Sequence, residues 1–241
     1  SVYLLNDLLD LSADRRHPRK RRRPFAAGTL PIAHGIIAMP ALLLSAFSLS
    51  LLINPFAFTA TLATYYIFTL AYSLRLKRTL MLDAITLAGL YTLRIIAGAA
   101  AVSVIPSFWM LAFSMFLFLS LALVKRYTEL RDSRLKGKSE LTPGRGYYPA
   151  DLEMVSALGA ASGYLSVMVL ALYTQDQTTA ALYQQPQLIW LACPLLLYWV
   201  TRTWMLAHRG QMHEDPVLFA IKDRVSLLVG ALFAAVFWIA A

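Results

Sequence analysis

The chain has 241 residues, of which 59% are hydrophobic and only 15% are charged. A soluble domain averages roughly 45–50% apolar and about 25% charged residues, so this composition excludes an ordinary globular domain and indicates a membrane protein. The formal net charge of +9 is typical of basic loops on one side of a membrane, and in so apolar a chain it does not indicate nucleic-acid binding.

The chain opens on the apolar run 1–5, which is too short to span a membrane and lacks the basic start of a signal peptide. We interpret it as the end of a helix in a longer protein. Seven later segments reach the roughly 20 apolar residues that a transmembrane helix needs. They are Ile32–Ile53, Pro55–Ser73, Leu82–Val104, Pro106–Val124, Asp151–Tyr173, Gln187–Ala207 and Leu218–Ala240. The sequence therefore predicts an all-α, polytopic transmembrane bundle of seven spans plus an N-terminal stub, in a single domain over 1–241.

The basic residues gather in every second connection between these segments. The connections that carry them are 10–31, 74–81, 125–150 and 202–224, and those that carry none are 54, 105 and 174–186. Every Lys and Arg except Arg94 therefore falls on one side, which the positive-inside rule makes cytoplasmic. We expect an integral protein of the bacterial inner membrane, with its active face cytoplasmic and its C-terminus on the far side.

The run Asn6-Asp7-Leu8-Leu9-Asp10-Leu11-Ser12-Ala13-Asp14 is the first motif that carries chemistry. Asn6, Asp10 and Asp14 are spaced at i, i+4 and i+8, so they share one helical face, with Asp7 beside them. Carboxylates on one face repel one another, and Mg²⁺, which binds carboxylate and phosphate oxygens, removes that repulsion. The run predicts a Mg²⁺ site at Asp7, Asp10 and Asp14 that also holds a diphosphate; the alternative is a solvated acidic helix end.

Three basic residues are candidates for binding phosphate oxygens. Arg23 stands before a proline and is expected to be held by a rigid turn. Lys77 lies between Tyr72 and Asp83, and Asp83 either takes part in catalysis or caps the next helix. Arg94 is expected inside the membrane, where an arginine is costly and marks a function or a buried partner. An anionic ligand and a carboxylate of the protein are both open as its partner.

Two further charged groups lie near later spans. Lys125-Arg126-Tyr127-Thr128-Glu129-Leu130 stands where a helix is expected to leave the membrane, and Asp223-Arg224 stands near the start of the final span. Both are candidates for substrate binding. The stretch 137–149, rich in Gly, Pro and Lys, is expected to be a mobile loop. The four histidines show no ligand spacing, so the sequence does not predict a zinc site.

The motif Asn6-Asp7-x-x-Asp10-x-x-x-Asp14, followed by Arg23-Pro24-x-x-x-Gly28, resembles the first signature of the UbiA superfamily of intramembrane prenyltransferases. The resemblance implies nine transmembrane helices around a central cavity, with this motif at the cytoplasmic end of the second helix. The stub at 1–5 then corresponds to the end of that helix. The chain is similar to a family member that lacks helix one and most of helix two.

Aromatic prenyltransferases of this family carry a second Asp-rich motif, which the string 125–130 replaces here. The chain is similar here to the decaprenyl-phosphate phosphoribosyltransferase branch, in that string together with Tyr72, Lys77, Leu82-Asp83, Arg94 and the Asp223-Arg224 pair. The similarity implies Mg²⁺-dependent transfer of phosphoribose from phosphoribosyl pyrophosphate, a diphosphate-bearing donor, to a polyprenyl phosphate. The implied partners are the polyprenyl lipid, the donor and the bilayer, without nucleic acid. The similarity is also compatible with a homo-oligomer and with a haloacid-dehalogenase-like domain upstream.

On this basis the expected catalytic residues are Asp10, Asp83, Lys77 and Arg94, and the expected Mg²⁺ ligands are Asp7, Asp10 and Asp14. The expected substrate-binding residues are Asn6, Arg23, Tyr72, Lys125, Arg126, Tyr127, Glu129, Asp223 and Arg224. Two other functions stay open. One is an aromatic or other prenyltransferase, in which Asp83 is the base that removes a ring proton. The other is a noncatalytic transporter or scaffold.

Overall fold

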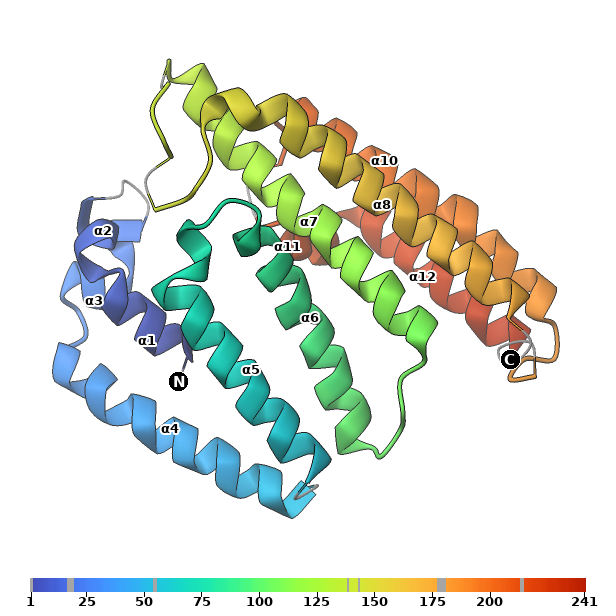
Figure 1. The fold of residues 1–241 in the computed structure, drawn as a ribbon, viewed down its shortest axis with the longest axis horizontal. Coiled ribbons are helices and arrows are strands. Elements are labelled where there is room, and N and C mark those ends of the chain that lie inside the picture. The colour runs from blue at the N-terminus through green and yellow to red at the C-terminus, as the bar shows by residue number, and fades with distance from the viewer. Residues whose placement is uncertain are drawn as a thin grey trace. The chain divides into compact units, whose positions relative to one another are not determined.

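The structure, a computed structural model, consists of helices and their connections. It describes residues 2–16, 20–53, 56–137, 139–142, 144–176, 181–212 and 215–241. Among these residues every regular element is a helix, and there is no strand (Figure 1). The all-α class predicted from the sequence is confirmed.

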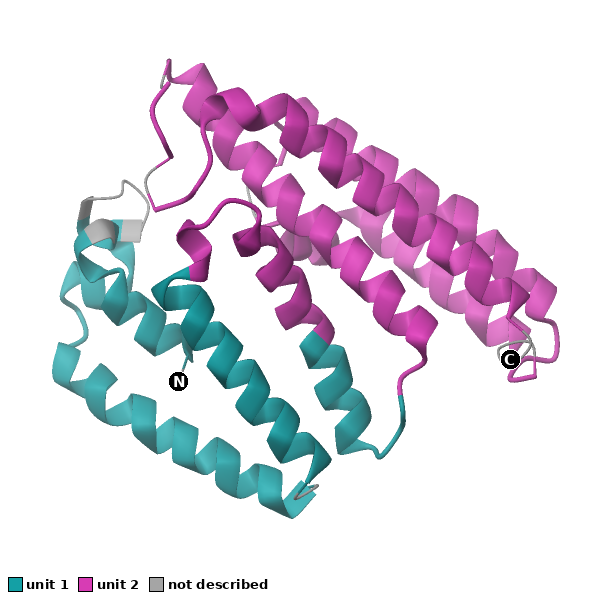
Figure 2. Cartoon of the chain, in the orientation of Figure 1, with its two compact units in different colours: residues 1–75, 93–105 teal, residues 76–92, 106–241 magenta. Residues whose placement is uncertain are grey.

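The chain forms two compact units, which Figure 2 colours separately. Unit 1 contains residues 1–75 and 93–105, and unit 2 contains residues 76–92 and 106–241. The boundary between them falls inside one helix, α6 (Leu82–Ala101), whose first half belongs to unit 2 and whose second half belongs to unit 1. The single domain over 1–241 stays a prediction.

In unit 1, two long helices and one short helix surround the turn that follows the acidic motif. The elements are α1 (Val2–Leu9), α2 (Leu11–Arg16), η1 (Lys20–Arg22), α3 (Pro24–Ala27), α4 (Ile32–Ile53) and α5 (Ala57–Leu74). Helix α1 packs against both α4 and α5. Gly35 permits a close approach on α4, because a Cβ there would lie 2.8 Å from the buried ring of Phe25. The short helix α3 is thereby held against α4.

Unit 2 is built around the long antiparallel pair α7 and α8, which lie side by side in Figure 1. Its elements are η2 (Leu76–Arg78), α7 (Phe108–Leu135), η3 (Pro149–Asp151), α8 (Leu152–Gln175), η4 (Pro186–Leu191), α10 (Ala192–His208), α11 (Pro216–Lys222) and α12 (Arg224–Ala240), together with the first half of α6. Ser120 Oγ donates to the Gly159 carbonyl at 2.7 Å and accepts from Trp204 Nε1 at 3.0 Å. Small and polar residues thus join three apolar helices, as they do inside membranes.

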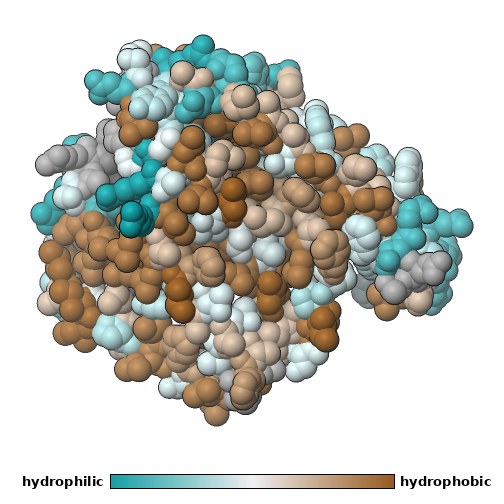
Figure 3. Space-filling model, viewed as in Figure 1, coloured by the Kyte–Doolittle hydropathy of each residue, from teal (hydrophilic) through white to brown (hydrophobic). Residues whose placement is uncertain are grey.

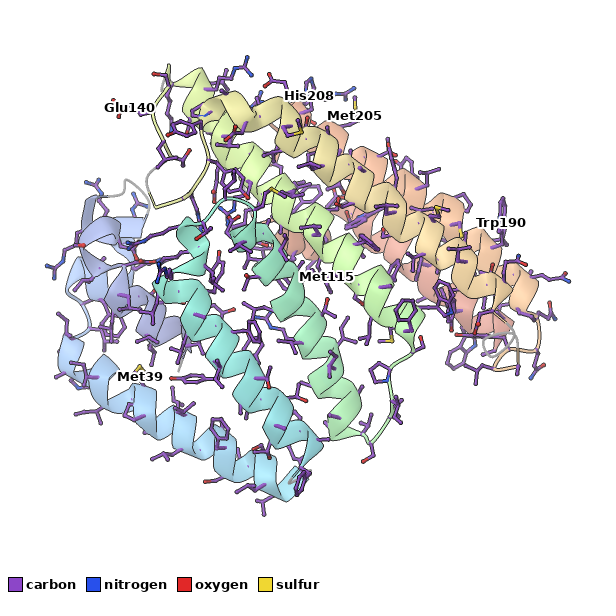
Figure 4. All side chains as sticks on the ribbon, viewed as in Figure 1. Met39, Met115, Glu140, Trp190, Met205 and His208 are labelled. Atoms are coloured by element: carbon purple, nitrogen blue, oxygen red, sulfur yellow. The ribbon has the colours of Figure 1, made fainter. Side chains whose placement is uncertain are left out.

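The predicted membrane spans are found as helices, and most of them are apolar enough to cross a bilayer. Among the residues that the structure describes, five helical segments qualify, and the bent pair α11 and α12 makes a sixth if it is counted as one span. Helix α5 is not among them, because its Thr and Tyr residues lower its hydropathy. Large apolar side chains are exposed along these helices, as the brown surface in Figure 3 and the outward-pointing Trp190 in Figure 4 show. Such a surface fits lipid rather than water.

The last predicted span, 218–240, is corrected by the structure, which breaks it at Asp223 with a bend of 80°. Asp223 has an extended backbone, and its carboxylate accepts from the backbone N–H of Ser226 at 2.8 Å, which caps α12. Arg202 makes a bidentate contact with the same carboxylate, in which Nη1 lies 2.6 Å from Oδ2 and Nη2 lies 3.1 Å from Oδ1. A cap and an ion pair at one residue therefore start a new helix where the apolar pattern predicts continuity.

Candidate functional site

The acidic motif lies on α1, α2 and the turn between them. The backbone N–H of Asp10 donates to the Asn6 carbonyl, and that of Asp14 donates to the Asp10 carbonyl, so the helical spacing continues through the turn. Arg23 Nη1 lies 2.8 Å from Asp7 Oδ1 and 2.8 Å from Asp14 Oδ2. Arg23 therefore contacts two residues of the acidic motif within unit 1, and phosphate binding by Arg23 stays a prediction.

The turn after the motif explains how Arg23 reaches the two carboxylates. Arg23 has an extended backbone (φ −63°, ψ 145°), and the proline after it takes the first position of α3, where a missing N–H costs nothing. Gly28 ends α3 with φ +77°, a left-handed conformation that favours glycine. Phe25, which is 3% exposed, anchors the turn in unit 1. The Arg-Pro-x-x-x-Gly pattern is thus the sequence of one rigid turn.

This motif fits Mg²⁺ that is bound together with a phosphate ligand. In the described part of the chain, no three His, Cys, Asp or Glu side chains gather into a ready metal site. Arg23 lies between Asp7 and Asp14, so these carboxylates form no closed metal cage. Asn6 Oδ1, however, is buried without a hydrogen-bond partner. Mg²⁺ commonly takes one or two carboxylates and completes its shell with water and substrate phosphate oxygens, and this all-oxygen donor set suits that arrangement.

A second polar cluster lies in unit 2, at the start of α6. Asp83 is fully buried, and its Oδ2 lies 2.6 Å from Nε of Arg126, which is 1% exposed. Asp83 Oδ1 accepts from the backbone N–H of Ala84 at 2.6 Å. Arg126 Nη1 also contacts Glu129, one turn further along α7. The structure thus joins two predicted site residues, 83 and 126, that are far apart in the sequence.

The connection between α7 and α8 supplies residues to this cluster that sequence reasoning missed. The Tyr147 hydroxyl donates to Asp83 Oδ1 at 2.6 Å, and Arg145 Nε lies 3.9 Å from Glu129 Oε2. Burial and the bond to Asp83 raise the pKa of Tyr147 well above its usual range, so its hydroxyl stays a donor at neutral pH. The adjoining Gly144-Arg145-Gly146 was a sequence signal for this contact, because glycines allow the loop backbone to lie close to another segment. The sequence suggested only a mobile loop.

Lys77 and Tyr72 lie on the chain segment that leads into this cluster. Lys77, on η2, is only 8% exposed, although lysine is rarely buried. Tyr72 lies half-buried on α5, in unit 1. Met81, between Lys77 and Asp83, has φ +61°, which is uncommon for a residue that is not glycine. A strained backbone of this kind persists only where the surrounding structure holds it, and here the Met81 N–H donates to the Tyr147 hydroxyl.

Arg94 lies in unit 1 and contacts a tyrosine. Its Nη2 donates to the Tyr65 hydroxyl at 2.7 Å, and its guanidinium carbon lies 5.4 Å from the centre of the Tyr65 ring. The sequence left an anionic ligand and a carboxylate open as partners, and neither describes this contact. The π-face of a tyrosine attracts a cation without a formal negative charge. Phosphate binding by Arg94 stays a prediction.

Four other predicted substrate-binding residues have structural partners or lie on the surface. Lys125 Nζ pairs with Asp215 Oδ2 at 2.5 Å, at the residue that caps α11. The Tyr127 hydroxyl lies 3.1 Å from Nδ1 of His208, the last residue of α10, which is labelled in Figure 4. Asp223 holds the break before α12, and Arg224 is exposed. The structure brings none of these contacts into the Asp83 cluster, and substrate binding by these four residues stays a prediction.

Unit 2 also contains an apolar cavity of about 320 Å³ between α7, α10, α11 and α12. Its lining includes Phe113, Leu117, Leu196, Trp199, Val229 and Phe233. A cavity of this size and lining suits a hydrocarbon group. The two polar clusters, by contrast, offer guanidinium groups, which bind phosphate oxygens, and carboxylates, which bind divalent cations.

The relatives of this chain fit these observations. Nodulation protein NoeC of Azorhizobium caulinodans is 36% identical over 230 residues, 94% of this chain and 73% of that protein. Uncharacterized protein y4nM of Sinorhizobium fredii is 36% identical over 238 residues, 98% of this chain but 46% of that protein, so the chain spans about half of its length. Decaprenyl-phosphate phosphoribosyltransferase of Mycolicibacterium smegmatis is 28% identical over 250 residues, 99% of this chain and 76% of that protein.

The family follows from a match along almost the whole chain. The model of the UbiA prenyltransferase family matches residues 1–228, which include both polar clusters and the start of α12. Members of this family are transferases of the membrane, in agreement with the apolar helices described above. This chain therefore belongs to the UbiA prenyltransferase family.

Proposed function

We propose that this protein transfers 5-phosphoribose from phosphoribosyl pyrophosphate to a polyprenyl phosphate. The observation that supports this choice most is the state of Asp83. Oδ1 accepts hydrogen bonds from Tyr147 and Ala84, Oδ2 lies in an ion pair with Arg126 without a hydrogen bond, and the residue is fully buried. A carboxylate in this setting orients its neighbours and is poorly placed to accept a proton from a substrate.

The reaction needs no protein base. A lipid phosphate oxygen is already anionic when it attacks the anomeric carbon of the ribose. The new C–O bond forms as the bond between that carbon and the diphosphate breaks, and the diphosphate leaves with the bonding electrons. Prenyl transfer to an aromatic ring, in contrast, must end with loss of a ring proton, for which Asp83 was the only candidate base in the sequence. The engagement of Asp83 therefore favours phosphoribosyl transfer.

Each cluster has a proposed part in this reaction. Asp7, Asp10 and Asp14 hold Mg²⁺ with the diphosphate of the donor, and Asn6 supplies a further oxygen. Magnesium bound there neutralises the charge that develops on the leaving diphosphate. Arg23 then turns toward the diphosphate oxygens. In unit 2, Lys77 and Arg126 bind anionic oxygens of the substrates, while Glu129 contacts the Arg126 guanidinium and Arg145 lies beside Glu129.

The lipid and the membrane complete the proposal. The apolar cavity of unit 2 is a candidate surface for part of the polyprenyl tail. The protein lies in a bacterial inner membrane with the polar clusters at the cytoplasmic face and the C-terminus on the far side, as the basic loops indicate. A homo-oligomer and an upstream haloacid-dehalogenase-like domain are kept as proposals. The phosphoribosyltransferase name carried by relatives 27–29% identical supports the donor.

A transfer assay tests this function. Membranes containing the full-length protein receive phosphoribosyl pyrophosphate labelled in the ribose, Mg²⁺ and a polyprenyl phosphate. We expect label in the organic-extractable lipid, dependent on Mg²⁺ and on the lipid phosphate. Membranes without the protein give the background. Absence of labelled lipid above that background, with the protein folded and in the membrane, contradicts the proposal.

A further inference from the structure

Tyr147 is buried in a place where an ordinary loop tyrosine would be exposed. It is 1% exposed, whereas its neighbour Tyr148 is 51% exposed. Its hydroxyl donates to Asp83 Oδ1 at 2.6 Å and accepts from the Met81 N–H at 3.2 Å. The hydroxyl therefore ties the α7–α8 connection to the segment that leads from Lys77 into α6. A buried hydroxyl with both functions satisfied has a single orientation.

The backbone beside Tyr147 is fitted to the same segment. A Cβ on Gly146 would lie 2.6 Å from the Leu80 nitrogen and 2.9 Å from the Arg78 carbonyl oxygen. Only glycine allows the two backbones to come this close. The Thr142 N–H donates to the Tyr147 carbonyl at 2.9 Å, and the Arg145 N–H donates to the Thr142 carbonyl at 3.0 Å, which closes a turn around residue 145. The conformation of this loop thus places the Tyr147 hydroxyl beside Asp83.

The chain of contacts continues from Asp83 to Arg126. Asp83 accepts Tyr147 on one oxygen and faces Arg126 Nε, 2.6 Å away, with the other. We propose that Tyr147 is a positioning residue whose hydroxyl fixes the Asp83 carboxylate and, through it, orients the Arg126 guanidinium toward a phosphate group of a substrate. This inference rests on the proposed function for the donor, but the positioning applies to any phosphate ligand of Arg126.

A simple packing role for Tyr147 makes a different prediction. Tyr147→Phe keeps the ring and removes the hydroxyl, so a residue that only fills space would tolerate it. A positioning residue would lose ligand affinity in a protein that remains folded. Tyr198→Phe is the matched control, because Tyr198 lies on α10 with 53% of its surface exposed.

The probe is inorganic pyrophosphate, titrated in the presence of Mg²⁺ into the full-length protein in detergent, with calorimetric detection. We expect Tyr147→Phe to raise the pyrophosphate Kd by about tenfold, since a hydrogen bond to a charged group is lost. Gly146→Ala, which pushes the loop away from residues 78–80, should raise it similarly. Tyr198→Phe should leave it unchanged. With the labelled donor, the KM should rise by more than kcat falls.

A double variant tests whether Tyr147 acts through Arg126. Combining Tyr147→Phe with Arg126→Lys should weaken pyrophosphate binding no more than Arg126→Lys alone, because both changes remove one interaction. Unchanged affinity in Tyr147→Phe, additive losses in the double variant, or a Tyr147→Phe protein that no longer folds would each overturn the positioning role. If wild type binds pyrophosphate more tightly than Tyr147→Phe but transfers no phosphoribose, the donor proposal fails and the positioning role stands.

Discussion

Replacing Arg126 by glutamine is expected to lower the free energy of unfolding by about 3–5 kcal/mol, the usual cost of removing one partner of a buried ion pair. Asp83 has no solvent contact, so the loss of Arg126 would leave its carboxylate without a charge partner in the interior. The contact from Arg126 to Glu129 would be lost as well. Unfolding of the wild type and Arg126→Gln in mixed detergent micelles, followed by circular dichroism, measures the difference.

Two further variants separate the buried charge from a general effect of losing an arginine. Arg134 lies on the same helix and pairs with Glu153, but their side chains are 54% and 69% exposed. Arg134→Gln should therefore change stability by less than about 1 kcal/mol. The double variant Asp83→Asn with Arg126→Gln should regain most of the lost stability, because no buried charge remains. Equal losses in Arg126→Gln and Arg134→Gln would contradict the buried pair.

The second large effect is expected at the acidic motif. Asp10→Asn should reduce the rate of phosphoribosyl transfer by at least roughly 10²–10³-fold, the range seen when one group that stabilises developing charge is removed. The variant keeps the size of the side chain and replaces an anionic carboxylate by a neutral amide, which is a weaker ligand for Mg²⁺. The residual rate should need a higher Mg²⁺ concentration than wild type. Transfer rates measured across a Mg²⁺ series give both values.

Glu140→Gln is the control for the loss of activity in Asp10→Asn. It also removes one carboxylate, but Glu140, labelled in Figure 4, lies exposed in the connection between α7 and α8. It should leave the rate and the Mg²⁺ dependence at wild-type values. The metal assignment would be wrong if Asp10→Asn turned over at the rate of Glu140→Gln.

The sequence was sufficient for the class of fold, and it singled out Asp7, Asp14 and Arg23, which the structure joins by short contacts. Apolar runs of membrane length predicted the helices, since the bilayer dictates their length and composition. Asp7, Asp10 and Asp14 lie close in sequence on α1, α2 and the turn between them, and Mg²⁺ binding by these residues stays a prediction. Arg23 contacts Asp7 and Asp14 from the turn that follows the motif, and Pro24 and Gly28 are the sequence signals of that turn. Short-range features of this kind can be predicted from a single sequence.

What the sequence could not give depends on contacts between distant segments. Tyr147 lies 64 positions from Asp83, and no local pattern links them. The break at Asp223 depends on Arg202, which lies 21 positions earlier on another helix. Arg94 finds an uncharged partner, Tyr65, which a search for charged partners overlooks. These pairings are set by helix packing, which hydropathy and spacing do not specify.

The product formed when both substrate pairs compete tests the central claim most directly. The purified full-length protein receives equal amounts of phosphoribosyl pyrophosphate with polyprenyl phosphate, and of polyprenyl diphosphate with 4-hydroxybenzoate, in the presence of Mg²⁺. Mass spectrometry of the lipid extract identifies what is made. We predict a polyprenyl phosphate heavier by one phosphoribosyl group, absent from the Asp10→Asn reaction. A prenylated aromatic acid as the main product would contradict phosphoribosyl transfer and return Asp83 to consideration as a base.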